Sequence, residues 1–476
     1  MRAEPQAGPY RPDPLILPLA DWLADPVEPA VFPMHELRFR NQRWAAAVGL
    51  DDLSEPQWID HCVRFLPLPG NLEQPLALRY HGHQFRVYNP DIGDGRGFLF
   101  AQIRDSAERL LDLGTKGSGQ TPYSRFGDGR LTLKGAVREI LATEMLEALG
   151  VNTSKTFSVV ETGEALVRGD EPSPTRSAVL VRLSHGHIRI GTFQRLAVLD
   201  EPEHMRSLID YCLETFPGPP PPDDAPGRNE PAAILLHQVV ERLADLAAAY
   251  MAAGFVHGVL NSDNMNISGE SFDYGPWRWL PRWDAEFTAA YFDHTGLYSF
   301  GRQPQAIHWN CAQLAIALRL IADAPPLIAA LDRFAPLYQQ ALARRLLWRL
   351  GVVSRGSEED SALIAAAEQQ MRDEGIAPDQ FFFRHRGGRN AAAADEFGEL
   401  LSAHAATGEN ADPLWAEPSA PSLVIDNVEA LWAAIDQGDD WRPLHAAIHE
   451  IRRLGGALGK PPPPAGHGAQ AFGNHT

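Results

Sequence analysis

The stretch that most constrains this chain is residues 254–276, GFVHGVLNSDNMNISGESFDYGP, because it combines short apolar pieces with closely spaced oxygen ligands. Asp263 and Asn264 are adjacent, and Asp273 follows in the same stretch. Carboxylates and a carboxamide without sulfur suit a hard cation such as Mg²⁺ or Mn²⁺, which completes its shell from phosphate oxygens. The apolar pieces on either side of a turn at 268–269 predict a hairpin-like unit with both acids at one end. The alternative is an ordinary loop, because Asn, Asp, Ser and Gly dominate turns.

The same stretch matches the catalytic core of protein kinases in its spacing. The kinase catalytic loop places an asparagine seven residues after a histidine, and an Asp-Phe-Gly motif follows. Here His257 and Asn264 have that separation, and Asp273 opens the sequence Asp-Tyr-Gly. The position of the kinase base falls on Val259, which cannot accept a proton, so Asp263 is the candidate replacement.

Length, charge and cysteine content limit the class of protein. A chain of 476 residues is too long for one simple core and predicts two or three domains or a two-lobed enzyme. Its net charge of −19 disfavours nucleic acid and anionic lipid as partners, so anionic ligands must be held by local arginines and lysines. Three widely separated cysteines argue against a disulfide framework and fit a reducing compartment. No secretory signal or membrane-spanning run is evident, so we expect a cytoplasmic protein.

Composition and periodicity divide the chain into segments. They predict an α+β chain with a mixed α/β N-terminal half and a mainly helical C-terminal half. The family resemblance carried by the motifs below implies that these halves are the lobes of a two-lobed protein-kinase-like fold, an N-terminal lobe that binds nucleotide and a C-terminal lobe that carries the catalytic and metal site. The expected boundaries are an N-terminal extension at 1–75, the first lobe at 76–216, a Pro-rich linker at 217–231, the second lobe at 232–355, a helical region at 356–460 and a disordered tail at 461–476.

Within these segments, several elements have clear signals. Alternation predicts strands at 156–168 and 177–183, and apolar residues at helical spacing predict a helix over 131–149 that ends at Gly150. Residues 234–253 predict an amphipathic helix that leads directly into the 254–276 stretch.

Basic and glycine-rich motifs in the first half could hold phosphate. The tetrapeptide GDGR occurs at 93–96 and at 127–130, and its paired glycines allow backbone N–H groups to form an anion-binding nest beside an arginine fork. Lys116 follows an apolar strand, and Glu139 lies 23 residues later, in the order of the kinase Lys–Glu ion pair. Surface turns and solvated side chains remain the alternative interpretation of each motif.

Together these motifs resemble the selenoprotein O (YdiU-like) family of protein adenylyltransferases. The resemblance rests on GHQFRVYNPDIGDGR, DLGTKGSGQTPYSRFGDGR, VREILATE, VRLSHGHIRIGTF, the 254–276 stretch and QPQAIHWN, from about residue 78 to 315. It implies a kinase-like fold that binds ATP in a flipped orientation and transfers AMP to Ser, Thr or Tyr hydroxyls of other proteins.

The resemblance also implies residue roles. Asp263 would be the proton acceptor, while Asn264 and Asp273 would hold Mg²⁺ or Mn²⁺. Glu139 would pair with Lys116. The residues implied to contact ATP are Gly93, Gly95, Arg96, Lys116, Asp128, Gly129, Arg182, Arg189 and Asp273.

The chain departs from the family pattern towards its ends. Residues before about 75 match poorly, the family's closing N-P-K-Y block is not visible, and the C-terminal Cys or selenocysteine is absent, which argues against redox control through that residue. Two other functions stay open. One is a kinase that transfers the γ-phosphate, and the other is an inactive nucleotide-binding scaffold, to which Val259 points.

Overall fold

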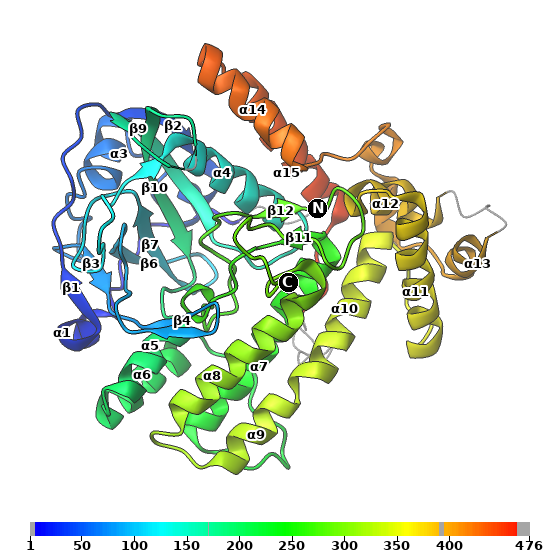
Figure 1. Cartoon of the computed structure of the whole chain (residues 1–476), viewed down its shortest axis with the longest axis horizontal. Helices are drawn as coiled ribbons and strands as arrows, with labels where there is room; N and C mark the ends of the chain where they lie inside the picture. Colours follow the sequence, from blue (N-terminus) through cyan, green and yellow to red (C-terminus); the bar gives the residue numbers. More distant parts are fainter. Residues whose placement is uncertain (1–4, 170, 390–394, 464–476) are drawn as a thin grey trace.

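The structure is a computed structural model that describes residues 5–169, 171–389 and 395–463. It shows an antiparallel sheet with helices on both faces, followed by a large helical region (Figure 1). The sheet has eight strands in the order β1-β3-β6-β7-β10-β9-β2, with β8 paired to β10. Its strands are β1 (Ala24–Pro26), β2 (Glu36–Arg40), β3 (Leu76–Leu78), β6 (Leu99–Arg104), β7 (Leu110–Lys116), β8 (Leu131–Thr132), β9 (Lys155–Leu166) and β10 (Thr175–Ser184). The strands expected at 156–168 and 177–183 correspond to β9 and β10.

Burial on both faces of the sheet follows from the alternation of side chains along β10. Ala178 and Leu180 face the core that contains helix α4 (Leu133–Ala148), whereas Val179 and Val181 face a second core. This second core is closed by α2 (Gln42–Ala47) and α3 (Glu55–Cys62). Helix α4 begins where the Thr132 hydroxyl accepts the N–H of Gly135, and its Glu139 pairs with Lys116 at the end of β7.

The N-terminal segment is part of the sheet, which corrects the expectation of an extension at 1–75. Strands β1 and β2 form its two edges, and a short helix α1 (Ala20–Leu23) precedes β1. Ile16 and Leu23 are buried in the main core. These apolar pieces are too short to show a periodicity in sequence, and the tertiary packing gives them their structure.

The helical lobe is organised around α7 (Pro231–Ala253), which is buried along almost its whole length. Against it pack α6 (Pro202–Thr215), α8 (Gln303–Leu318), α9 (Ala324–Asp332) and α10 (Phe334–Leu350), and α5 (Ile190–Val198) packs on α8. The expected helix at 234–253 is therefore present. Its neighbours α8 and α10 run beside it in the lower half of Figure 1.

The sequence predicts that the Pro-rich segment 217–231 separates the two lobes. In the structure it does not. Helices α5 and α6 precede it, and both already pack on helices of the second lobe. The chain instead crosses between lobes directly after β10, at about 185–189. A crossing this short has no compositional signature, whereas the prolines mark only the loop between α6 and α7.

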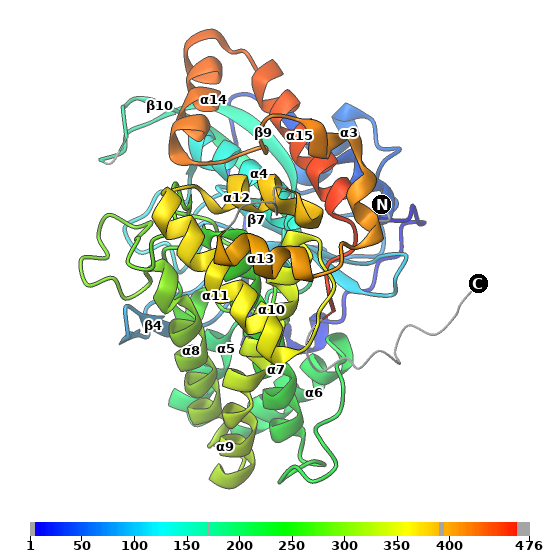
Figure 2. The ribbon, with the colours of Figure 1, turned by 90° about the vertical axis from the view of Figure 1, so that its right-hand side faces the viewer.

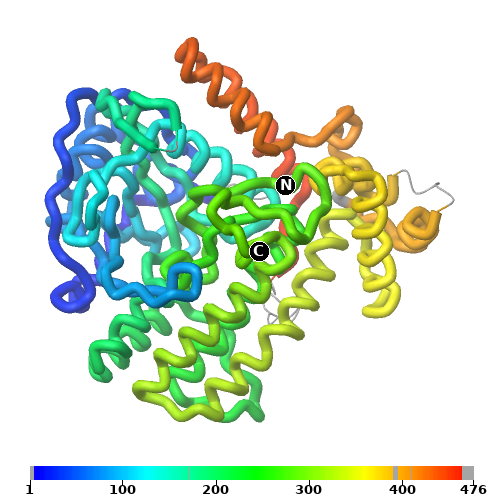
Figure 3. Tube along the Cα trace, in the orientation of Figure 1, coloured from blue at the N-terminus to red at the C-terminus, as the bar shows by residue number. Residues whose placement is uncertain are grey.

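Beyond α10 the chain forms further helices and returns to the first lobe (Figures 2 and 3). They are α11 (Ser357–Glu374), α12 (Pro378–His385), α13 (Glu396–Ala403), α14 (Ile425–Gly438) and α15 (Arg442–Leu458). Arg452 of α15 pairs with Glu144 of α4 at 2.6 Å, and Lys134 of α4 pairs with Glu429 of α14 at 2.7 Å. Most of the tail expected to be disordered, residues 464–476, lies outside the described residues. None of the helices in the described part of the chain combines the length and apolar character needed to cross a bilayer.

Candidate functional site

A cavity of about 310 Å³ lies where the end of β7, the first GDGR loop and the 254–276 stretch meet. It brings together the predicted residues Gly93, Gly95, Arg96, Lys116, Arg182, Arg189, Asp263 and Asp273. Its walls therefore combine arginine and lysine side chains from the first lobe and the crossing with two carboxylates from the second.

The 254–276 stretch is not the hairpin that its sequence predicted. Strand β11 (Phe255–Val256) pairs with β12 (Arg278–Trp279), outside the stretch, and a 3₁₀ turn at Ser262–Asn264 lies between them. The backbone beyond that turn bonds instead to the first lobe and the crossing: Ile267 N–H donates to Ile188 O, and Ser154 N–H donates to Ser271 O. The turn itself is present, closed by Gly269 N–H on Asn266 O, but these contacts across the lobes replace the expected pairing of its two arms, because they give partners to backbone groups that would otherwise be buried without them.

Lys116 is the centre of the site. It is 4% exposed, and its Nζ lies 2.7 Å from Glu139 Oε2 and 2.8 Å from Asp273 Oδ1. The ion pair between Lys116 and Glu139, expected from their order in sequence, is present. This arrangement holds the ammonium at the inner end of the cavity and links helix α4 to the second lobe.

Asp273 is held in a left-handed backbone conformation, with φ of 61°. Burial alone raises the pKa of its carboxyl, but Lys116, Arg96, Arg182 and Arg189 together hold that pKa well below its usual value. Asp273 is therefore ionised at neutral pH. Its second oxygen, Oδ2, makes no hydrogen bond with the described residues and is free to bind a cation.

Arg182 is a cation in the wall of the cavity that makes no direct ion pair with any side chain in the described ranges. It is 6% exposed, its guanidinium lies 5.2 Å from the centre of the Phe272 ring, and it interacts with the charge of Asp273 without contacting it. Burying a guanidinium without a hydrogen-bonded anion is costly, so an anionic ligand beside Arg182 would complete the site.

Arg189 ties the two lobes together beside Arg182. It donates to the backbone oxygen of Asp263 at 3.0 Å and to Asp94 Oδ1 at 2.9 Å. Its guanidinium also lies 4.3 Å from the centre of the Tyr80 ring. The side chain thus fixes the loop that carries Asp263 against the GDGR loop that follows Ile92.

Asp263 presents a carboxylate to the same cavity. Burial raises the pKa of its carboxyl to about 6, and Arg189 opposes that rise. Oδ1 is buried and makes no hydrogen bond within the described residues, and Gln84 Nε2 lies 3.5 Å from Oδ2. At pH 7 this group is mostly ionised yet basic enough to accept a proton, which suits a general base.

Asn264 and Asp273 are the predicted ligands of a divalent ion, and of the two only Asp273 lines the cavity. Asn264 Nδ2 donates to Val259 O at 3.0 Å, which leaves Oδ1 as its ligand atom. The described ranges contain no group of three or more His, Cys, Asp or Glu side chains placed to hold a metal. Two protein oxygens with a shell completed by phosphate is the arrangement typical of Mg²⁺ in nucleotide sites, so the donor set fits such an ion.

Asp128 and Gly129 do not line the cavity, so their contact with ATP stays a prediction. Asp128 pairs with Arg168 at 2.8 Å, on the far part of the loop that follows Lys116. Gly129 lies where a Cβ would be 2.2 Å from Gly119, so the second GDGR makes a tight turn within that loop.

The cavity also contains residues that the sequence did not single out: Tyr80, Gln84, Ile92, Asp94, Gly97, Thr115, Tyr123, Ser124 and Arg125. Tyr123 covers Gly93, where a Cβ would lie 2.4 Å from its ring, and its hydroxyl donates to Asp25. Gly97 is required because a Cβ there would lie 2.0 Å from Thr115 O. The signals for Tyr123 and Gln84 were present in the motifs GTKGSGQTPYSR and GHQFRVYNPDIGDGR, the second of which contains β4 (Gly82–Gln84) and β5 (Val87–Asn89), whereas Tyr80 precedes it and had no separate signal.

Glu270 attaches the segment that carries Asp273 to the crossing that follows β10. This residue is 6% exposed, and its Oε2 accepts the N–H of His185 at 2.8 Å. Burial raises the pKa of its carboxyl to about 7, although Lys155, the His185 N–H and Arg109 lower it.

A stability measurement over pH tests this buried carboxyl. Because the folded protein holds the proton of Glu270 more tightly than the unfolded chain does, the associated stability is present below about pH 4.5 and lost as pH rises through about 7. Glu270→Gln keeps an acceptor for His185 N–H but does not titrate. We expect its melting temperature relative to the wild type to be higher at pH 8 than at pH 5, by an amount corresponding to about 2–3 kcal/mol. An offset that does not change with pH would contradict this ionisation behaviour.

Comparison with known proteins identifies the family of this chain. A family model described as "Protein adenylyltransferase SelO" matches residues 13–417, so the match begins well before residue 75. The chain is 40% identical over 477 residues to a protein from Synechococcus elongatus named "Protein nucleotidyltransferase YdiU", covering 93% of this chain and 95% of that protein. The proteins of the same name from Synechocystis sp. and Azotobacter vinelandii are 41% and 36% identical, covering 92% and 85% of this chain and 97% and 86% of their own lengths.

Among solved structures, the kinase domain of a Toxoplasma gondii rhoptry antigen aligns with a TM-score of 0.28 and 11% identity, covering 57% of this chain and 75% of that one. The family match and the relatives extend over most of the chain and include every residue of the cavity. This chain therefore belongs to the SelO family of protein adenylyltransferases.

Proposed function

We propose that this protein transfers AMP from ATP to Ser, Thr or Tyr hydroxyls of other proteins, with Asp263 as the base and a divalent ion at Asn264 and Asp273. The observation that carries the proposal is the composition of the cavity wall. On one side lie the buried cations Lys116 and Arg182, the second without a direct ion pair in the described ranges, and on the other lie the carboxylates of Asp263 and Asp273. The cations of this cavity would bind the phosphates of ATP, and the Asp263 carboxylate, whose pKa is raised, would accept a proton in the same cavity.

The cationic side chains bind and orient the triphosphate. Arg96, Arg182 and Lys116 would neutralise charge on the phosphate oxygens, which is the dominant contribution in transfers of this kind. Glu139 keeps Lys116 in position. Arg189 keeps the Asp263 loop against the first lobe, so that the base and the phosphate-binding groups stay in register.

The chemical step follows from the position of Asp263. Its carboxylate takes the proton of the acceptor hydroxyl while the hydroxyl oxygen bonds to the α-phosphorus. The bond from the α-phosphorus to its bridging oxygen breaks, and pyrophosphate leaves with the electron pair. A divalent ion, when held by Asn264 and Asp273, would supply charge neutralisation for the phosphates.

Labelled ATP tests this function against its alternatives. Incubation of the protein and Mg²⁺ or Mn²⁺ with cell-lysate proteins should transfer label from the α-phosphate of ATP, and none from the γ-phosphate, because only AMP carries the α-phosphorus onto the acceptor. Transfer of the γ label would instead identify a kinase. A nucleotide-dependent rise in melting temperature without transfer of either label would identify an inactive scaffold, the alternative raised by Val259 at the kinase base position.

A further inference from the structure

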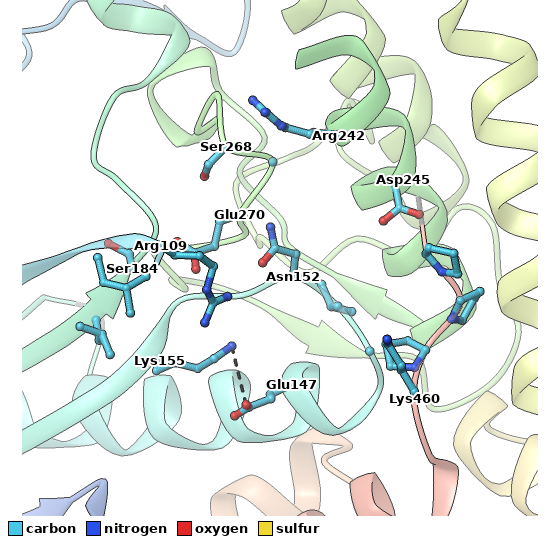
Figure 4. Close-up of a pocket in the computed structure, with 18 of the residues that line it drawn as sticks. Arg109, Glu147, Asn152, Lys155, Ser184, Arg242, Asp245, Ser268, Glu270 and Lys460 are labelled. Atoms are coloured by element: carbon cyan, nitrogen blue, oxygen red, sulfur yellow. Dashed lines mark ion pairs between the residues drawn. The ribbon is translucent and has the colours of Figure 1, made fainter. Parts of the chain in front are cut away.

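A second, larger cavity of about 460 Å³ lies behind the first and shares no lining residue with it. Its walls come from both lobes and from the C-terminal segment: the start of β7, the end of α4, β9, the end of β10, α7, the 268–270 turn and residues 460–463. Figure 4 shows the polar side chains that converge on it. The proposed reaction uses none of them.

Lys155 is a cation in this cavity that makes no hydrogen bond to a carboxylate of the described residues. An oxygen of Glu147 lies 3.9 Å away, and Glu147 itself pairs with Arg43 at 2.7 Å. The Lys155 Nζ donates to Thr153 O at 2.6 Å. Burial lowers the pKa of Lys155, although Glu147 and Glu270 raise it, and a further anion placed beside it would oppose the effect of burial. Arg109 lies close to Lys155 at the centre of Figure 4.

Glu270 lies at the same place with one oxygen unused. Oε2 accepts the His185 N–H, whereas Oε1 makes no hydrogen bond with any residue that the structure describes. The side chain is 6% exposed and forms part of the cavity wall. A buried carboxyl of this kind needs a partner, and in this cavity that partner must come from a ligand or from water.

The remaining charges of the wall are largely satisfied. Arg345 and Asp245 form an ion pair of 2.5 Å, and Arg242 donates to the backbone oxygens of Phe216 and Ile267. The apolar part of the wall includes Leu111, Val151, Leu183 and the prolines 461–463. The groups left for a ligand therefore lie beside an apolar surface. They are Lys155, Glu270 Oε1 and the hydroxyls of Ser184 and Ser268, both of which are buried without a hydrogen-bond partner among the described residues.

We propose that this cavity binds the phosphate group of a small organic phosphate monoester, with Lys155 and Arg109 facing its oxygens and Glu270 sharing the hydrogen of its P–OH. The monoanion of such an ester, R–O–PO₃H⁻, offers both acceptor oxygens for the cations and a hydroxyl donor for the carboxylate, as inorganic monohydrogen phosphate does. Sulfate and carboxylate ions have the acceptors but lack the donor, so Glu270 would select against them. The apolar wall would contact the organic part. This inference does not depend on AMP transfer.

The test is calorimetric titration of the full-length protein, free of nucleotide, with inorganic phosphate and with sulfate at matched ionic strength. The wild type should bind phosphate more tightly than sulfate. Lys155→Met should weaken phosphate binding about tenfold or more, the usual loss for a charge-assisted hydrogen bond. Lys134→Met, the same substitution on the far part of α4, should leave binding unchanged and controls for net charge.

A further variant tests the carboxyl. Glu270→Gln, whose amide can donate as well as accept, should remove the preference for phosphate over sulfate. Phosphate bound in the nucleotide cavity would be unaffected by Lys155→Met and by Glu270→Gln, so a response to both substitutions assigns the binding to the second cavity. The proposal is overturned if the wild type binds no phosphate, if Lys155→Met binds it as tightly as the wild type, or if Glu270→Gln keeps the full preference.

Discussion

Asp273→Asn is expected to abolish AMP transfer, with a loss at least as large as the roughly 10²–10⁴-fold that removal of a general base costs. The substitution removes the negative charge that balances Lys116 and the arginines and the carboxylate available to a divalent ion. Asparagine is chosen because it tolerates the left-handed backbone that Asp273 adopts, whereas alanine at φ of 61° would add strain. The measurement is the transfer rate from ATP labelled at the α-phosphate.

A folding defect is distinguished from a binding defect by the metal dependence of nucleotide binding. The wild type should be stabilised more strongly by ATP with Mn²⁺ or Mg²⁺ than by ATP alone, and Asp273→Asn should lose this difference while its melting temperature without ligand shows that it is folded. Wild-type transfer by a folded Asp273→Asn variant would show that the ion is held elsewhere.

Asp263→Asn is expected to lower the maximal rate of AMP transfer by about 10²–10⁴, because the side chain can no longer accept the hydroxyl proton. Its effect on the binding of ATP should be small. The phosphate-binding cations remain, and the Arg189 guanidinium bonds to the backbone oxygen of residue 263, not to its side chain. The same labelled assay, combined with titration of ATP, separates the rate from the affinity.

The contrast between the two variants is the sharper test. Asp273→Asn should lose metal-dependent binding together with transfer, whereas Asp263→Asn should lose transfer alone. Full activity in Asp263→Asn or Asp263→Ala would show that this residue is not the base. Gln84→Ala, which removes only the neighbour 3.5 Å from Asp263 Oδ2, serves as a mild control expected to reduce transfer less than either.

The sequence determined the elements whose signals are local. Helix α4 and helix α7 were predicted because their apolar residues repeat at helical spacing over many residues, and β9 and β10 because alternation is maintained over their length. The family and the Lys116–Glu139 ion pair were likewise predicted and are confirmed, whereas the oxygen ligands of the 254–276 stretch stay a prediction. Motifs that follow one another in a fixed order identify a family even where the structure of the segments between them cannot be predicted.

Tertiary structure alone decided what depended on contacts between distant segments. The segment before residue 75 became sheet edges because its short apolar pieces found a core, and the 254–276 stretch paired with the first lobe and not with itself. The crossing between lobes lies after β10, where no compositional signal marks it. The second cavity brings Glu270 of the 254–276 stretch to Lys155 of β9, a proximity that no motif indicates. Sequence encodes local periodicity directly, whereas the partner of a buried charge is fixed only when the folded chain brings the two together.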